Sequence, residues 1–217
     1  YADISTFFRL PIVKDLSKLD YCFCGVPWDG GTTNRPGARH GPREVRNASS
    51  LVRLYHPVSL KSPYDMYNVA DVGDCPVNPA DLQDSLSKIE IFFKNISKMN
   101  TIPISIGGDH SVTGGIVQSL AKKNSKLTKG KKITFLHFDA HTDCFEKLDH
   151  FLGAKKSAAH WASYLVKQGN VDPHTSTQIG IRGNPRTLDW LQASYDIGYQ
   201  VITMDEYREW GLSLIHI

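Results

Sequence analysis

The chain has 217 residues, enough for one sizeable α/β domain with its own core. Hydrophobic residues make up 41% of it and charged residues 22%, which excludes a disordered or fibrous protein. The formal charge is only +3, and the one dense basic run, 122–132, is typical of a solvated loop. We therefore expect no nucleic-acid partner, and the absence of a long apolar window predicts no membrane partner.

Predicted strands and helices alternate along the chain from residue 21 onward. The predicted strands are 21–27, 66–74, 101–109, 131–139, 177–183 and 200–205. The predicted helices are 43–55, 79–100, 111–124, 158–169, 185–198 and 204–211. Strands that alternate with helices of this length pair in parallel, which predicts an α/β fold with helices on both faces of one sheet. We expect a single domain over residues 1–211.

Apolar spacing supports two of these helices in particular. In 79–100 the apolar residues recur every three or four positions, as Leu82, Leu86, Ile89, Phe93 and Ile96. In 43–55 the corresponding residues are Val45, Leu51, Val52 and Tyr55. The four cysteines form no CxxC pair or compact disulfide framework, so we expect reduced thiols and a cytoplasmic protein.

Polar side chains gather where three of the predicted strands end. They are Asp29, before a glycine-rich loop, then Asp109 and His110, and then Asp139, His141 and Asp143. In an open parallel α/β sheet the functional site lies outside the carboxyl ends of the strands. Three separate segments therefore point to one site.

The motif Asp139-x-His141-x-Asp143 predicts a metal centre. If the backbone stays extended, these alternating side chains point to one side. Carboxylates combined with imidazole suit Mn²⁺, Ni²⁺ or Zn²⁺ better than Ca²⁺. With His110 added, the donors are too many for one tetrahedral ion and suit two metals that share a bridging Asp. His137, one step outside the motif, is more typical of a core or sheet-face histidine.

Three segments resemble the arginase–agmatinase (ureohydrolase) family. They are 105–113, "SIGGDHSVT", 137–143, "HFDAHTD", and 25–49, which is similar to the agmatinase-like branch. The similarity extends from about Cys22 to Met204. It implies a three-layer α/β/α fold, a homo-oligomer (trimer or hexamer), and a site with two Mn²⁺ ions that releases urea from a guanidino compound.

The resemblance also implies a role for each motif residue. His110 would bind the first metal, His141 the second, Asp139 both, and Asp143 would complete the first. Asp109 either orients His110 or caps the next helix, and both readings stay open.

His160 is the expected proton shuttle, since imidazole titrates near neutral pH. Trp161, which departs from the family pattern, and the hydroxyls of Thr32 or Thr33 are the expected substrate contacts. The expected substrate is agmatine or another small guanidino compound. Free guanidine with Ni²⁺ is the alternative, and a non-catalytic metal-stabilised protein is a second. Arginine is disfavoured because the loop 144–151 lacks the Asn and Ser of arginases, and a Zn²⁺ deacetylase is disfavoured by Asp143.

Two further family ligands, in an SxDxDxxDP segment, have no match in the chain. We therefore expect the remaining metal ligands to lie beyond Ile217 and the chain as given to be inactive. Residues 212–217, "LSLIHI", resemble a translated sequencing adapter, so we expect a non-native tail there.

Overall fold

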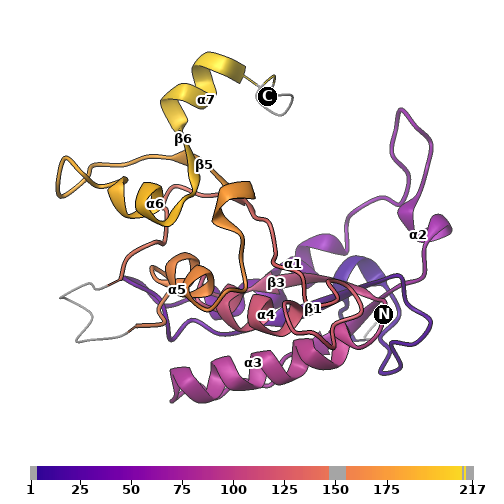
Figure 1. The fold of residues 1–217 in the computed structure, drawn as a ribbon. Helices are drawn as coiled ribbons and strands as arrows, with labels where there is room; N and C mark the ends of the chain where they lie inside the picture. The colour runs from indigo at the N-terminus through magenta and orange to yellow at the C-terminus, as the bar shows by residue number, and fades with distance from the viewer. Residues whose placement is uncertain (1–3, 147–154, 212, 214–217) are drawn as a thin grey trace. The chain divides into compact units, whose positions relative to one another are not determined.

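The computed structural model describes residues 4–146, 155–211 and 213 (Figure 1). Its strands form two three-stranded parallel sheets within two compact units, 1–130 and 131–217. The expected α/β class with parallel strands and flanking helices is confirmed, and hydrogen-bond pairing among the described residues groups the six strands in threes. The assignment of 1–211 to one domain stays a prediction. Apart from Ser213, the predicted tail 212–217 lies outside the described residues.

The first unit is built around a central strand with one parallel neighbour on each side. Strand β1 (Tyr21–Val26) pairs with β2 (Val69–Asp74) and with β3 (Ile102–Gly107). The other elements of this unit are η1 (Phe7–Arg9), η2 (Ala38–His40), α1 (Gly41–Ser49), α2 (Pro63–Met66), α3 (Leu82–Ser97) and α4 (Val112–Leu120). None of the helices in the described ranges is long and apolar enough to cross a membrane.

Helical elements cover both faces of this sheet. On one face, alternate β1 residues such as Cys24 join a buried core with Ile89 and Phe93 of α3. On the other face, Phe23 packs against the rings of Phe7 and Phe8 in η1. This alternation follows from the two-residue period of a strand, which sends successive side chains to opposite faces. All four cysteines are buried and free, as expected.

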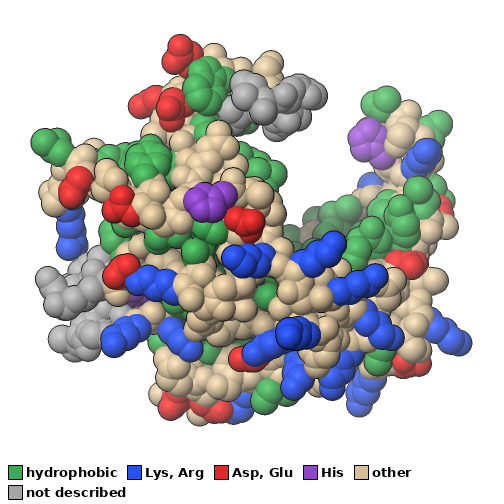
Figure 2. All heavy atoms as spheres, in the orientation of Figure 1, with side chains coloured by type: hydrophobic (Ala, Val, Ile, Leu, Met, Phe, Trp, Pro, Cys, Tyr) green, Lys and Arg blue, Asp and Glu red, His purple; other side chains and the backbone are tan. Residues whose placement is uncertain are grey.

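Helix α1 is shorter than the predicted helix 43–55. It ends at Ser49, and Leu51, Val52 and Tyr55 lie exposed in the segment 50–67 that follows. This segment also carries α2, and the space-filling view shows hydrophobic side chains along it (Figure 2). The helical spacing of Leu51, Val52 and Tyr55 wrongly predicted that the helix continues to residue 55. No part of the described unit covers these side chains, so no packing holds this segment as a helix.

The second unit repeats the plan on a smaller scale. Its strands are β4 (Leu136–Phe138), β5 (Thr177–Ile181) and β6 (Gln200–Thr203), with β5 in the centre. Its helices are α5 (Trp161–Lys167), η4 (Pro173–Thr175), α6 (Gln192–Ile197) and α7 (Met204–Trp210). Ile179 and Ile202 pack with Tyr207 of α7 on one face.

The opposite face of this sheet meets α5. The indole of Trp161 packs edge-on against Phe135 and His137, with ring centroids 5.1 Å and 4.9 Å away. Tyr199, just before β6, donates its hydroxyl to the carbonyl of Ala162 at 3.1 Å. Each unit therefore has helices on both faces of its own sheet, the layering expected of an α/β/α protein.

A buried ion pair joins the N-terminal segment of the first unit to its sheet. Asp71 of β2 is fully buried and receives Nε of Arg46 at 2.8 Å and the amide of Phe7 at 3.0 Å. The Arg46 guanidinium also lies over the Phe7 ring, 4.0 Å from its centroid. Burial by itself raises the pKa of Asp71, but the Arg46 hydrogen bonds and two backbone amides hold it below its ordinary value.

Replacement of Arg46 by Met should lower the free energy of unfolding by about 3–5 kcal/mol, because it leaves the Asp71 carboxylate buried without its cation. Urea denaturation of the full-length protein measures this loss. Arg208→Met, which removes an exposed partner of Asp205, is the matched control and should change little. Equal effects of the two substitutions would contradict a special role for the buried pair.

Candidate metal centre and its flanking loop

The end of β4 turns sharply instead of continuing as a strand. Strand pairing stops at Phe138, although the amide of Asp139 still donates to Ile179 at 3.1 Å. The amide of His141 then folds back onto Oδ1 of Asp139 at 2.9 Å, and Asp143 has a left-handed φ of 51°. The expectation that an extended backbone aligns Asp139, His141 and Asp143 is therefore wrong.

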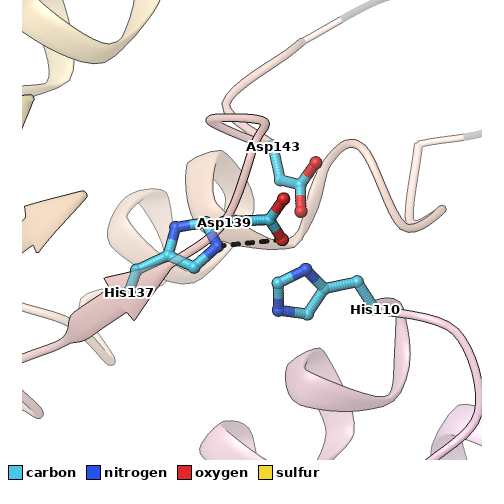
Figure 3. Close-up of side chains that lie close together, drawn as sticks. All are labelled: His110, His137, Asp139 and Asp143. Carbon is cyan, nitrogen blue, oxygen red and sulfur yellow. Dashed lines mark ion pairs between the residues drawn. The ribbon is translucent and has the colours of Figure 1, made fainter. Parts of the chain in front are cut away.

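A different set of side chains converges at this turn (Figure 3). His137, Asp139 and Asp143 each offer a ligand atom, and these atoms lie within 4.8 Å of one another. His137 Nε2 lies 3.4 Å from Asp139 Oδ2. Two carboxylates this close repel each other unless a cation lies between or beside them, and carboxylate with imidazole is a donor set suited to a divalent metal. The residues present therefore fit a metal ion.

His141 lies outside this group. Its side chain is 74% exposed, and its Nδ1 atom lies 3.5 Å from Asp139 Oδ1. His137 was expected to be a core histidine, and it is buried, but it also faces Asp139. The alternation that relates Asp139 to His141 equally relates His137 to Asp139, so the signal for His137 was present in the sequence. The role of His141 as a metal ligand stays a prediction.

His160 lies directly before α5, in a buried position. Its Nδ1 atom is 2.7 Å from the hydroxyl of Ser157, and its Nε2 atom is buried without a hydrogen-bond partner among the described residues. Burial lowers the pKa of the imidazole, and the nearby Asp143 carboxylate offsets part of that effect. His160 is therefore neutral at neutral pH, and Nε2 is the atom left to exchange a proton.

Trp161, expected to touch substrate, is almost completely buried. Its indole Nε1 donates to Oδ2 of Asp143 at 2.8 Å. In this structure the tryptophan therefore contacts a residue of the candidate metal centre.

Asp139 also lines an open pocket of about 320 Å³ within the second unit. The pocket is lined by Phe138, Asp139, Ala140, Ile179, Gly180, Arg182, Met204 and Tyr207. Its volume is at the lower end of the range typical of small-molecule sites. The carboxylate that would hold a metal is thus accessible to a small solute.

In the first unit, the glycine-rich loop after β1 is organised by a buried carboxylate. Asp29 accepts hydrogen bonds from the amide of Gly37 at 2.6 Å and from Nε of Arg39 at 2.6 Å. Hydrogen bonds from the Arg39 side chain and from the backbone amides of Gly37 and Arg39 lower the pKa of Asp29 to about 2. Thr32 and Thr33, the expected substrate contacts, lie in this loop, half-buried and exposed respectively.

A second carboxylate ties the same loop to the turn that carries His110. Asp109 Oδ2 accepts from the amide of Gly31 at 2.8 Å, and Oδ1 accepts from the amide of Ser111 at 2.7 Å. A Cβ atom at Gly31 would overlap Ser111, and one at Gly108 would overlap the carbonyl of Trp28. Only glycine permits this close approach. Asp109 thus bonds to Ser111, the residue before α4, and to the glycine loop, while α4 itself has no side-chain cap among the described residues. Whether Asp109 also orients His110 stays a prediction.

Comparison with known proteins shows the family to which the chain belongs. The model of the arginase family matches residues 19–216. Guanidinopropionase of Pseudomonas aeruginosa is 44% identical over 214 residues, and the mitochondrial guanidino acid hydrolase of Homo sapiens is 37% identical over 214 residues. Each alignment covers 98% of this chain, which spans 64% and 57% of the length of these relatives.

Solved structures agree with the sequence comparison. Proclavaminate amidino hydrolase of Streptomyces clavuligerus superimposes with a TM-score of 0.86 at 31% identity, covering 97% of this chain and 67% of that one. The protein is thus an α/β protein with a carboxylate–imidazole centre at a strand end and the fold of known amidino hydrolases. The chain belongs to the arginase family.

Replacement of Asp29 by Asn should flatten the dependence of stability on acid pH. The folded-state pKa of Asp29 is depressed from 3.8 to about 2, so its contribution is fully present above about pH 4 and is lost as the pH falls towards 2. Urea unfolding of the full-length protein between pH 5 and 2 measures the slope. Asp205→Asn, at an exposed carboxylate, is the control, and an unchanged slope in Asp29→Asn would contradict the assignment.

Proposed function

We propose that the protein is a binuclear-metal hydrolase that cleaves a guanidino C–N bond and releases urea. The observation that carries the proposal is the group of His137, Asp139 and Asp143 at the end of β4, in a chain that belongs to the arginase family. Bound there, two Mn²⁺ ions would lower the pKa of water and so supply hydroxide at neutral pH.

The proposed ligands are those of the two family motifs. Asp139 would be shared by both ions, Asp143 and His110 would bind one, and His141 would bind the other. His137, whose Nε2 faces Asp139, would hold that carboxylate in place. His110 joins this set by its motif, since it follows the turn that Asp109 fixes at the end of β3.

The reaction needs a proton at a particular atom. Hydroxide would add to the guanidino carbon, the C–N bond would break as the C=O bond of urea forms, and the proton lost by the hydroxyl would be carried to the amine, which departs with the electron pair. An unprotonated amide anion is a very poor leaving group, so a nearby acid must deliver that proton. His160 Nε2 is buried, has no hydrogen-bond partner among the described residues and lies near Asp143, which supports His160 as the shuttle.

The substrate is proposed from chemistry and from the relatives. Agmatine or another small guanidino compound suits the accessible pocket beside Asp139. Thr32 or Thr33 stays the proposed polar contact, on the chemistry of the hydroxyl alone. The names guanidinopropionase and guanidinobutyrase, at 44% and 34% identity, add guanidino acids to the candidates. Free guanidine with Ni²⁺ is the alternative.

The eight exposed apolar side chains of segment 50–67 support a homo-oligomer, and they are Leu51, Val52, Leu54, Tyr55, Val58, Leu60, Met66 and Tyr67.

Urea release from a substrate panel tests the proposal. The full-length protein, loaded with Mn²⁺ or Ni²⁺, is offered agmatine, 3-guanidinopropionate, 4-guanidinobutyrate and guanidine, and at least one should give urea. Asp139→Ala should abolish turnover, because the residue would be shared by both ions, while Asp205→Ala should not. Full turnover by Asp139→Ala would refute the metal assignment, and no urea from any substrate would favour a non-catalytic family member.

Replacement of His160 by Ala should lower kcat by roughly 10²–10⁴-fold, the usual range for a lost general acid or base, and leave the metal content near that of the wild type. Steady-state kinetics and elemental analysis of the same samples measure both. His174→Ala, at an exposed histidine of the second unit, is the control. Loss of metal together with activity would show that His160 is a ligand or a structural residue instead.

A further inference from the structure

Two segments of the second unit are joined by a set of backbone hydrogen bonds around Asp143. The carbonyl of Asp143 accepts from the amide of Ala162 at 3.2 Å, and the amide of Phe145 donates to the carbonyl of Ala159 at 3.2 Å. The hydroxyl of Ser163 adds a bond to the carbonyl of Phe145 at 3.0 Å. The start of α5 therefore holds the backbone that presents the Asp143 carboxylate.

The side chain of Trp161 completes this attachment. Its indole is 1% exposed, Asp143 is 7% exposed, and the Nε1–Oδ2 distance between them is 2.8 Å. The indole ring cannot swing away, because Phe135 and His137 pack edge-on against it. Asp143 itself has a φ of 51°, a conformation that few non-glycine residues adopt. An uncommon backbone conformation and a rigid donor thus both help to set the direction of its carboxylate.

We propose that Trp161 is a positioning residue for the metal centre, which it serves by donating its indole N–H to Oδ2 of Asp143 and so fixing the direction of that carboxylate. This inference rests on the proposed function, since it needs a metal at Asp143. A neutral donor suits the task, because an arginine or lysine in the same place would neutralise the charge that attracts the cation. Indole also does not titrate, so the carboxylate keeps its direction at every pH at which the protein is folded.

The expected change in metal affinity is estimated from other metalloproteins in which a group hydrogen-bonds to a metal ligand. Groups that hydrogen-bond to metal ligands usually contribute 10–100-fold to metal affinity. Without the indole N–H, Asp143 Oδ2 would lose a buried donor, and the carboxylate would be held less firmly in its binding direction. The loss should fall on metal binding and should be overcome by excess metal, whereas loss of a catalytic group would not.

The test is Trp161→Phe in the full-length protein, which keeps an aromatic ring against Phe135 and removes the N–H. The Kd for Mn²⁺, measured by competition with a chelator and elemental analysis, should rise 10–100-fold, and kcat at saturating Mn²⁺ should return towards wild type. Tyr199→Phe is the matched control, because it also deletes one buried donor to α5, at Ala162, without touching Asp143. Its Kd should not change.

Each outcome of these Kd measurements either supports or overturns the proposed role of Trp161. An unchanged Kd in Trp161→Phe, with wild type that binds Mn²⁺, overturns the inference and leaves the proposed function intact. Equal weakening in both variants also overturns it, because it shows a general packing effect. A wild type that binds neither Mn²⁺ nor Ni²⁺ overturns the proposed function and the inference with it. If Trp161→Phe does not fold, replacement of Trp161 by 3-benzothienylalanine, which exchanges the N–H for sulfur at nearly equal shape, gives the same readings.

Discussion

The burial of carboxylates is the constraint on which both units depend. A carboxylate removed from water loses several kcal/mol of hydration free energy unless donors or a cation replace it. Four aspartates of the described residues are less than a tenth exposed, namely Asp29, Asp71, Asp109 and Asp143. Each of them holds together segments that lie apart in the sequence, because the required donors come from elsewhere in the chain.

The partners divide these carboxylates into two kinds. Asp29 and Asp71 are paired with arginines, Arg39 and Arg46, so their charge is already compensated within the protein. Their pKa values are held below the ordinary value, and they are structural anchors. A carboxylate so compensated has little attraction left for a metal ion or a cationic substrate.

Asp109 and Asp143 accept hydrogen bonds from neutral donors. Asp109 accepts from two backbone amides, and Asp143 accepts from an indole. Burial, with a smaller effect of the Asp29 charge, raises the pKa of Asp109 in spite of its hydrogen bonds to Gly31 and Ser111. Neutral donors fix the direction of a carboxylate without cancelling its charge. Asp109 and Asp143 belong to the two family motifs, which follow β3 and β4 and where a metal ion is expected to bind.

The sequence by itself determined the alternation of strands and helices, the α/β class and the two motifs that identify the family. These features depend on local periodicity and on short segments such as GGDHS, which neighbouring residues largely define. The sequence also identified Asp139 and Asp143. It placed the end of β4 at Asp139 and the end of the first helix at Tyr55, and both boundaries were wrong, because the partner strand and the covering elements decide where pairing and packing stop.

Only the tertiary structure decided which groups meet at the turn after β4. After β4 the amide of His141 turns back onto Asp139, the His141 side chain is exposed, and His137 faces Asp139, an outcome that strand alternation cannot distinguish. The contact between Trp161 and Asp143 joins residues 18 positions apart and depends on a ring held by Phe135 and His137. Such contacts form only when several segments pack together. The pattern of residues along any one segment therefore cannot predict them.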